Sequence, residues 1–332
     1  MTERDVVISG YGVAGELHAH LFAARPDARI VGVADPSQFR RAAAEDRFPG
    51  ITTASTLHDL TVHTDIVVIA TPPLFHDGDC WTAITRHHAH VLCEKPAIVD
   101  PVGGRHLGSI ASEQQLVIWP VHNYLYAPAV RTMRNLLKSG AIGDIRQAYI
   151  DIERIAPSAA HTAWRRSTAE GGGILNDHGP HPLYLLSYFL GHNADAVSCR
   201  TDRGDHGVEQ SARLGLKYST TTADISLNWK SGARQSRYRF YGSKGQLTWE
   251  RDKLTVITLS NTSAFCVDDL SAPGHTHASW TRSLHAEFLN LVDSGRQSRH
   301  WWHAVNVAAV LRAARVSECA GGRWADVAML PE

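Results

Sequence analysis

Two short stretches of the chain carry the side chains best suited to proton transfer. The first, "AWRRSTAEGGGILNDHGPH", places Asp177 and His181 directly before an apolar helical pattern. These two residues are four apart, so they share one face if the segment is helical. Imidazole titrates at a pKa of ~6.5, which suits His181 to exchanging a proton near neutral pH. The alternative interpretation is that Asp177 and His181 only cap the helix.

The second stretch is "HAHVLCEKPAIVD", in which an apolar run over residues 91–93 ends in Glu94-Lys95 and then Pro96. A surface turn needs no apolar strand, and a buried strand needs no adjacent charges. In a parallel sheet, however, ligands bind beyond the carboxyl ends of the strands. We therefore expect Lys95 at the edge of a ligand site, with Glu94 as a hydrogen-bond acceptor beside it. Pro96 is expected to fix the direction of the backbone after the strand.

A glycine-rich turn near the start of the chain predicts a dinucleotide site. In "VVISGYGVAGELHAHLF" the pattern GxGxxG falls between a predicted strand and a predicted helix. Glycine permits a tight turn and a close approach of the backbone to a pyrophosphate, and the helix N-terminus offers free N–H groups to the phosphates. The alternative is a glycine-rich turn without ligand. The residues predicted to line the cofactor here are Gly10, Tyr11, Gly12, Val13, Ala14 and Gly15.

Two further strand ends are predicted at the same edge of the sheet. Asp35 ends the second strand, where a carboxylate accepts hydrogen bonds from the adenosine ribose and repels a 2′-phosphate. This favours NAD over NADP. Arg40 and Arg41 follow, either to hold a phosphate or as a solvated helix face. "DIVVIATPPLFH" supplies the other strand end, with the candidate cofactor residues Thr71, Pro72, Pro73 and His76.

The elements that position these residues change in kind near residue 121. Before it, Val- and Ile-rich strands alternate with helical patterns, which predicts a doubly wound parallel sheet. After it, several predicted strands alternate apolar with polar residues, which is typical of antiparallel strands with one solvent-exposed face. We expect an α/β Rossmann domain over 1–121 and a substrate-binding and oligomerisation α+β domain over 122–332. The predicted strands are 6–9, 30–34, 66–70, 91–93, 117–120, 147–154, 196–200, 211–217, 222–229, 237–241, 246–250 and 254–259.

Composition excludes several classes of protein. The 332 residues include 33 basic and 33 acidic ones without a basic cluster, so we expect no nucleic-acid partner. No apolar run is long enough for a membrane span, and "MTERDVVISG" has no signal-peptide pattern, which predicts a cytoplasmic protein. The five cysteines never form CxxC, and the 20 histidines include no HExxH. We therefore expect no metal.

The chain resembles the glucose–fructose oxidoreductase/inositol dehydrogenase (Gfo/Idh/MocA) family over nearly its whole length. The resemblance rests on the motifs above, on "HNYLYAPAVRTMRNLLKSGAIGDIR" and on "YGSKGQL". It implies that Lys95, Asp177 and His181 form the catalytic group, and it suggests a cis peptide between Lys95 and Pro96. The family commonly has arginine at Leu125 and leucine at Asn176, so the substrate cannot be transferred from a known member. Our candidates for substrate contact are Lys95, His122, Tyr124, Tyr126, Trp164, Arg165, Asp177 and His181.

The resemblance implies an NAD-dependent dehydrogenase or ketoreductase. We expect it to act on a ring hydroxyl of a sugar, cyclitol or glycoside, such as an amino sugar or aminoglycoside in a biosynthetic pathway. We also expect a homodimer or homotetramer that assembles through the C-terminal sheet. The alternatives are an imine or tetrapyrrole reductase, redox-neutral glycoside cleavage with recycled NAD, and a non-catalytic dinucleotide-binding regulator.

Overall fold

A computed structural model describes residues 3–157, 160–204, 207–232, 234–267, 277–295 and 299–327, with the backbone alone at 160–162. The chain divides into two units, which are described separately. The first comprises Met1–Val121 and Arg282–Val305, and the second comprises His122–Thr281 and Asn306–Glu332. The segment Arg282–Val305, which the sequence analysis assigned to the second domain, is therefore part of the first unit.

The first unit is built on a six-stranded parallel sheet in the order β3-β2-β1-β4-β5-β6. The order reverses between β1 and β4, and in such sheets the ligand crevice lies at this switch point. The central strand β4 is wholly apolar and buried, and β1 is buried from Val6 to Ser9, as expected of a sheet that is covered on both faces. The strands are β1 Arg4–Ser9, β2 Ala28–Ala34, β3 Thr52–Ala54, β4 Ile66–Ile69, β5 His90–Cys93 and β6 Ile118–Pro120.

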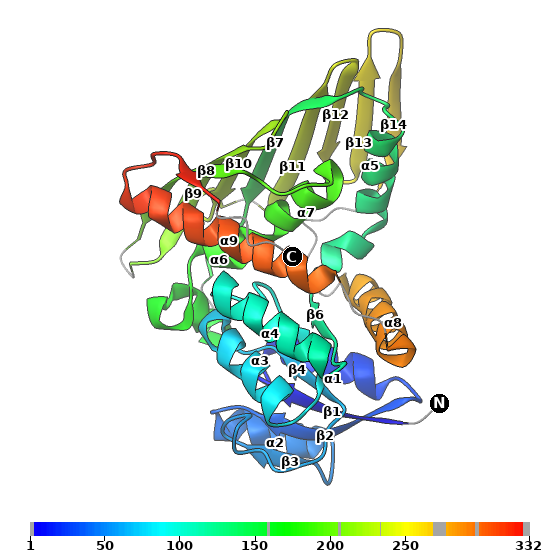
Figure 1. Cartoon of the computed structure of the whole chain (residues 1–332), viewed down its shortest axis with the longest axis vertical. Coiled ribbons are helices and arrows are strands. Elements are labelled where there is room, and N and C mark those ends of the chain that lie inside the picture. The colour runs from blue at the N-terminus through cyan, green and yellow to red at the C-terminus, as the bar shows by residue number, and fades with distance from the viewer. Residues whose placement is uncertain are drawn as a thin grey trace. The chain divides into compact units, whose positions relative to one another are not determined.

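Four helices of this unit follow the strands as crossover connections (Figure 1). Helix α1 packs against β1, β2 and β4, and α2 packs against β2 and β3. Helix α3 packs against β4, β5 and α4. Local sequence sets the starts of two helices. Ser37 accepts a hydrogen bond from the Arg40 N–H at the start of α2, and Asp100 accepts two at the start of α4. The helices are α1 Val13–Ala23, α2 Gln38–Arg47, α3 His76–Thr85 and α4 Pro101–Glu113, with a short 3-10 turn η1 at Pro73–Phe75.

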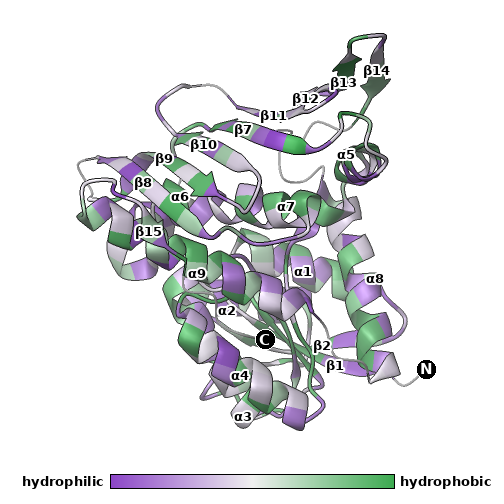
Figure 2. Cartoon of the chain, turned by 45° about the horizontal axis from the view of Figure 1, so that its top comes forward, coloured by the Kyte–Doolittle hydropathy of each residue, from purple (hydrophilic) through white to green (hydrophobic). Residues whose placement is uncertain are grey.

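The second unit contains a nine-stranded sheet in the order β14-β13-β12-β11-β7-β10-β9-β8-β15. Its strand pairs are antiparallel except for β7 with β10. Buried residues alternate with more exposed ones along β7, β9 and β10, and Figure 2 shows the matching alternation of green and purple. The strands are β7 Ile145–Glu153, β8 Ala196–Arg203, β9 Glu209–Lys217, β10 Thr222–Asn228, β11 Gln235–Gly242, β12 Gly245–Glu250, β13 Lys253–Thr258, β14 Thr262–Cys266 and β15 Ala325–Asp326.

Two helices of this unit carry the Asp177–His181 motif next to the sheet. A short α6 contacts β9 and β10, and α7 follows it after Gly179, whose backbone is itself helical. The break between them is explained by Pro180 and Pro182, which lack the N–H groups a continuous helix would use. The helices of this unit are α5 Pro128–Lys138, α6 Ile174–His178, α7 Pro180–Leu190 and, from Asn306 on, α9 His300–Cys319, with 3-10 turns η2 Asn123–Tyr126, η3 Ala160–Arg166 and η4 Thr168–Glu170. Most of α8 Ala278–Ser294, from Arg282 on, and the start of α9 belong to the first unit.

The predicted fold class is confirmed: a parallel Rossmann sheet is followed by a large, mostly antiparallel sheet. The structure adds three strands that were not predicted, β3, β14 and β15. Two of them have only two or three residues, too few for a periodic pattern. Among the described residues, no helix has the length and apolar character needed to cross a membrane.

Candidate active site

The glycine turn between β1 and α1 is shaped by close backbone contacts. Gly10 has a φ of +87°, and a Cβ there would lie 2.6 Å from the backbone N of Thr71. A Cβ on Gly15 would lie 1.9 Å from the carbonyl oxygen of Gly10. Packing within the unit therefore requires glycine at both positions. Gly10 brings the turn against the end of β4, and Gly15 brings α1 against the turn.

Gly12 has a different environment from the other two glycines. A Cβ there would meet only the guanidinium of Arg40, at 3.7 Å, and the residue has a φ of −93° that any amino acid can adopt. Gly12 is also the N-cap of α1, and it supplies no side chain to the first N–H groups of the helix. An open glycine beside uncapped helical N–H groups fits a pyrophosphate, so this turn suits NAD.

Asp35 lies next to the turn and is 2 % exposed. Its Oδ2 accepts a hydrogen bond from the Tyr11 N–H at 2.8 Å, and its Oδ1 accepts one from the Ser37 N–H at 2.8 Å. The Arg40 guanidinium lies 3.5 Å from Oδ2. A carboxylate can accept about four hydrogen bonds, so capacity remains for the hydroxyl groups of a ribose.

The end of β4 is tied to the Lys95 turn by a buried histidine. His76 Nε2 lies 2.6 Å from the carbonyl oxygen of Thr71, and its Nδ1 lies 2.8 Å from that of Pro96. Both partners are backbone carbonyl oxygens, so the ring links the Thr71 loop to the Lys95 turn. The Thr71 hydroxyl in turn donates to Asp79 at 2.8 Å. Burial raises the pKa of the Asp79 carboxyl, and the hydrogen bond from Thr71 partly offsets that effect.

Glu94 precedes Lys95 and contacts the buried His18, which in turn contacts a second buried histidine. His18 on α1 lies 3.2 Å from Oε1 of Glu94 through Nε2, and 2.8 Å from Nε2 of His285 on α8 through Nδ1. The other carboxylate oxygen of Glu94 accepts the Lys95 backbone N–H at 3.2 Å. Burial raises the pKa of Glu94, but the hydrogen bond and charge of His18 together with the charge and backbone N–H of Lys95 outweigh it, so the pKa lies below its ordinary value. Glu94 is therefore an anion that fixes the backbone of the turn.

The peptide bond between Lys95 and Pro96 is cis, which confirms the expectation drawn from the family resemblance. Lys95 itself is partly buried. The first unit thus brings the glycine turn, Asp35, the Thr71 loop and the Lys95 turn to the carboxyl ends of neighbouring strands.

His181 in the second unit lies in an aromatic cluster. Its Nδ1 is 2.9 Å from the Tyr184 hydroxyl, and the ring of Tyr124 stacks on the imidazole at 4.3 Å. His122 stacks on Tyr184 at 4.1 Å. The imidazole is 6 % exposed. The sequence analysis proposed His122 and Tyr124 for this region but did not name Tyr184, although Tyr184 lies three residues after His181 and so one helical turn away.

Asp177 is paired with Arg165, another candidate from the sequence. Oδ2 of Asp177 accepts a hydrogen bond from Arg165 Nε at 2.7 Å, and it lies 3.3 Å from Nε2 of His178. The Arg165 guanidinium also lies over the ring of Trp164, at 4.7 Å. Neither α6 nor α7 has a side-chain hydrogen bond at its N-cap, where both have glycine. Neither Asp177 nor His181 is therefore the N-cap residue of one of these helices.

The remaining candidates and histidines have separate surroundings. Tyr126 lies beneath the Arg131 guanidinium of α5, at 5.7 Å. The histidines of "RHHAH" bond to unrelated partners: His87 to the Leu57 carbonyl, His88 to the Gln114 side chain and His90 to the Val117 N–H. They form a polar connection from α3 into β5, as the sequence analysis expected.

Comparison with known proteins gives matches in both halves of the chain. Residues 4–122 match the family model for the "oxidoreductase family, NAD-binding Rossmann fold", and residues 130–248 match the "GFO/IDH/MocA C-terminal domain". One curated relative is a dTDP-3,4-didehydro-2,6-dideoxy-alpha-D-glucose 3-reductase of Streptomyces violaceoruber. It is 28% identical over 308 residues, which cover 89% of this chain and 87% of the relative.

Two further comparisons concern sugar enzymes and the fold. A D-glucoside 3-dehydrogenase of Escherichia coli is 28% identical over 57% of this chain and 54% of the relative. A crystal structure of GenD2 from gentamicin A biosynthesis, in complex with NAD, matches with a TM-score of 0.83 and 24% identity. The match covers 100% of this chain and 97% of that one, and it supports the fold.

Proposed function

Because the chain belongs to the Gfo/Idh/MocA oxidoreductase family, we propose that it is an NAD-dependent dehydrogenase, or in reverse a ketoreductase, for a secondary ring hydroxyl of a sugar, cyclitol or glycoside. The observation that carries the proposal is a combination of two features in one chain. The first unit has an open Gly12 at an uncapped helix N-terminus, and the second has a buried imidazole, His181, in an aromatic cluster.

The cofactor supplies the hydride acceptor, and the residues of the chain handle the proton. His181 takes the hydroxyl proton through Nε2, since Nδ1 faces the Tyr184 hydroxyl. The ammonium of Lys95 holds the same substrate oxygen and stabilises the developing alkoxide charge. Asp177, which accepts a hydrogen bond from Arg165, orients the polar groups around the imidazole. These roles follow the family motif at each of the three positions.

The substrate contacts are proposed from the side chains around His181 and Asp177. His122, Tyr124 and Trp164 offer aromatic faces that suit the apolar face of a sugar ring, and Arg165 donates to hydroxyl oxygens. Tyr126 completes the set from the same segment as Tyr124. The reductase relative acts, by its name, on a dTDP-linked deoxy sugar. We extend the proposal to amino sugars and aminoglycosides in biosynthetic pathways, which share that ring chemistry.

The sheet of the second unit is the proposed oligomer interface, giving a homodimer or homotetramer. Its less buried face carries Tyr149, Asp151, Arg239 and Tyr241, with an ion pair between Arg239 and Asp151 at 2.6 Å. A planar face with aromatic and paired charged groups suits self-association. Light scattering of the wild type and of a Tyr149→Glu/Tyr241→Glu variant tests this. A monomeric wild type would refute it.

The proposed location is the cytoplasm. All five cysteines are free thiols, and Cys266 and Cys319 are exposed, as suits a reducing compartment. Cell fractionation tests the location, and recovery outside the cytoplasmic fraction would contradict it.

The test of function is a panel of sugars, cyclitols, glycosides and aminoglycosides with NAD, read as NADH formation. The matching keto sugars with NADH cover the reverse direction. We expect turnover with at least one ring alcohol, and none with that alcohol after its reacting hydroxyl is replaced by hydrogen. NAD binding without turnover on any member, in either direction, would contradict the proposal.

A further inference from the structure

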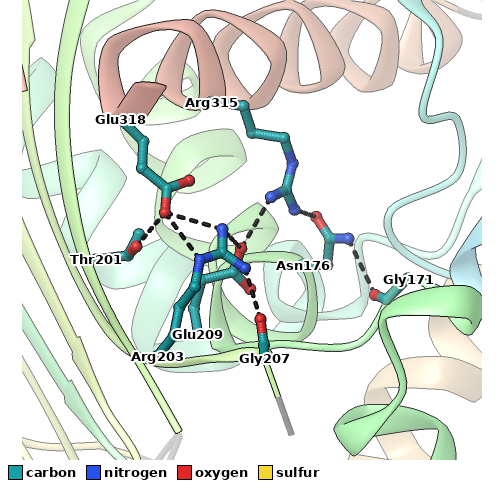
Figure 3. A network of polar contacts seen from close by, with 8 residues as sticks. All are labelled: Gly171, Asn176, Thr201, Arg203, Gly207, Glu209, Arg315 and Glu318. Atoms are coloured by element: carbon teal, nitrogen blue, oxygen red, sulfur yellow. Dashed lines mark hydrogen bonds and ion pairs between the residues drawn. The ribbon is translucent and has the colours of Figure 1, made fainter. Parts of the chain in front are cut away.

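We propose that Asn176 and Arg315 are positioning residues that fix the turn Gly171–His178 and thereby the orientation of Asp177. The inference rests on the proposed function of Asp177. The two residues are 139 apart in sequence and lie on α6 and α9 of the second unit. Figure 3 shows Arg315 extending from α9 to the Asn176 amide, which in turn faces the Gly171 carbonyl.

The Asn176 amide bridges the turn to α9. Its Nδ2 donates to the Gly171 carbonyl oxygen at 3.0 Å, and its Oδ1 accepts from Nη2 of Arg315 at 2.9 Å. Asn176 is 8 % exposed, so water competes little for either bond. Arginine can only donate and a carbonyl can only accept, so the two partners together allow one orientation of the amide. A side chain that lacks either group would leave a buried partner unsatisfied.

Arg315 is itself held by a buried carboxylate. Its Nη1 donates to Oε1 of Glu209 at 2.9 Å, and Glu209 is 2 % exposed. Arg203 donates to the same oxygen at 3.1 Å and also pairs with Glu318 at 2.8 Å. The network therefore contains two arginines and two glutamates whose charges balance (Figure 3). Paired charges of this kind hold the Arg315 guanidinium in one place.

The same carboxylate also limits where the turn can lie. Gly173 has a φ of +104°, and a Cβ on it would lie 1.8 Å from Oε2 of Glu209. Glu209 thus touches the turn directly at Gly173 and indirectly through Arg315 and Asn176. Removing Arg315 would leave the Gly173 contact in place but would release the Asn176 amide.

The turn carries Asp177 and its partner together. The Gly173 N–H donates to the Arg165 carbonyl at 2.9 Å, and the Asp177 N–H donates to the Gly173 carbonyl at 3.0 Å. Arg165 and Asp177 then meet through the hydrogen bond of 2.7 Å between their side chains. A shift of the turn therefore moves both members of the pair. Misplacement of a catalytic group by about 1 Å can cost about 10²-fold in rate.

Arg203 provides a matched control because it shares Glu209 with Arg315 but makes no bond to Asn176 among the described residues. Their side chains are similarly exposed, at 43% and 39%. We expect Arg315→Met to lower kcat by about 10- to 100-fold and to leave the Kd of NAD unchanged. Arg203→Met should change kcat little. Asn176→Asp keeps the shape of the side chain and the bond to Arg315 but loses the donor to Gly171, so it should lower kcat as much as Arg315→Met does. In the double variant, kcat should fall no further than in the more impaired single variant.

Hydrogen exchange of the backbone amides in residues 171–178 supplies a readout that needs no substrate. Exchange in this segment should be faster in Arg315→Met and Asn176→Asp than in the wild type and Arg203→Met. Wild-type exchange and wild-type kcat in both variants would overturn the inference, as would an equal loss in Arg203→Met. Faster exchange in a protein that turns over no member of the sugar panel would instead uphold the positioning role and reject the proposed function. If Arg315→Met does not fold, Arg315→Lys and the isosteric Asn176→Asp decide the matter by the same two readouts.

Discussion

At the scale of a single residue, we expect Asp35 to control the choice between NAD and NADP. Its carboxylate already holds the N–H groups of Tyr11 and Ser37 and keeps capacity for ribose hydroxyls. A 2′-phosphate would be brought against this buried anion, so we expect NAD to bind more tightly than NADP. Asp35→Ser should narrow or invert the preference, as measured by calorimetric titration with each cofactor.

Arg40 supplies the counterpart of that experiment, because its guanidinium lies 3.5 Å from the same carboxylate. In the Asp35→Ser background, Arg40→Met should weaken NADP more than NAD. A wild type that binds NADP more tightly than NAD would show that Arg40 dominates the site and that the Asp35 argument is wrong.

His181 should determine turnover and not cofactor affinity. We expect His181→Ala to lower kcat by about 10²–10⁴-fold, the usual contribution of general acid–base catalysis. Because we propose that the imidazole contacts the substrate and not the cofactor, the Kd of NAD should stay constant. Tyr184→Phe keeps the ring but removes the hydroxyl partner of Nδ1, so it should cause a smaller loss. Steady-state kinetics on one substrate compares the variants.

Lys95 is expected to act on the same substrate oxygen as His181. Lys95→Ala should also lower kcat, and the double variant should lose less than the product of the two single losses. Fully multiplicative losses would mean that the two side chains act in separate steps. Near-normal turnover in His181→Ala would move the role of base to Lys95 or Asp177.

Residue types and spacing could predict the reactive groups but not all of their partners. Asp177, His181 and Trp164-Arg165 are visible as a polar cluster before an apolar helix. Arg315 is not, because its link to Asn176 spans 139 residues and depends on how α9 packs in the second unit. The departure at Asn176 from the family's leucine was a signal that a polar partner had to exist nearby.

At the scale of the element, the turn into α1 separates ligand binding from packing. Gly12→Ala places a methyl group where only Arg40 is near, at 3.7 Å, in a backbone conformation that alanine can adopt. We expect it to leave the melting temperature unchanged and to weaken NAD binding, since the methyl group occupies the approach of the pyrophosphate. Thermal unfolding and cofactor titration measure the two effects.

Gly15→Ala is the matched control in the same turn. Its methyl group would lie 1.9 Å from the Gly10 carbonyl oxygen, so this variant should lose stability even without cofactor. Equal loss of stability in both variants would mean that Gly12 is also a packing residue, and unaltered NAD affinity in Gly12→Ala would remove the pyrophosphate from this turn.

Elements with strong periodicity were predictable, and short ones were not. The strands β1, β2, β4, β5 and β6 follow from runs of Val and Ile, which hydrophobic burial on both faces requires. In contrast, β3 has three residues, Thr52–Ala54, and forms because Gly32–Ala34 offers it a partner strand. That pairing is a tertiary contact, which local sequence does not encode.

At the scale of the whole molecule, buried neutral histidines should make the fold sensitive to acid. Burial, followed by the charge of His18, lowers the pKa of His285 well below its ordinary value. Burial, followed by the charge of His303, lowers that of His300 to about 4. The unfolded chain takes up these protons at a pH of ~6.5 while the folded chain does not, so stability falls as the pH drops below that value.

His285→Phe should reduce this loss of stability, because one buried group no longer titrates in the unfolded chain alone. The slope of the free energy of unfolding against pH, between neutral pH and pH ~5, should fall by at most about 1.4 kcal/mol per pH unit. Denaturant unfolding at several pH values measures this slope. His58→Ala, an exposed change, is the control and should keep the wild-type slope. A slope that His285→Phe leaves unchanged would contradict the neutral state assigned to His285.

Only one of the boundaries between the two units could be predicted from the sequence. The boundary at Val121 coincides with the change of periodicity, but Arg282–Val305 returns to the first unit. Within this segment His285 contacts His18, which is 267 residues away in the sequence. An amphipathic pattern predicts that α8 is a helix, but it does not predict which sheet the helix packs against. The high histidine content was visible in the sequence, whereas its use in buried positions such as His18, His76 and His285 required the structure.

The most direct test of the central claim follows the hydride itself. A sugar or cyclitol that supports NADH formation is prepared with deuterium on its ring carbinol carbons, and the NADH formed is examined by mass spectrometry. We predict one deuterium in the nicotinamide ring for each substrate molecule oxidised, together with loss of this transfer in His181→Ala. NADH that carries no deuterium, or transfer at the wild-type rate in His181→Ala, would contradict it.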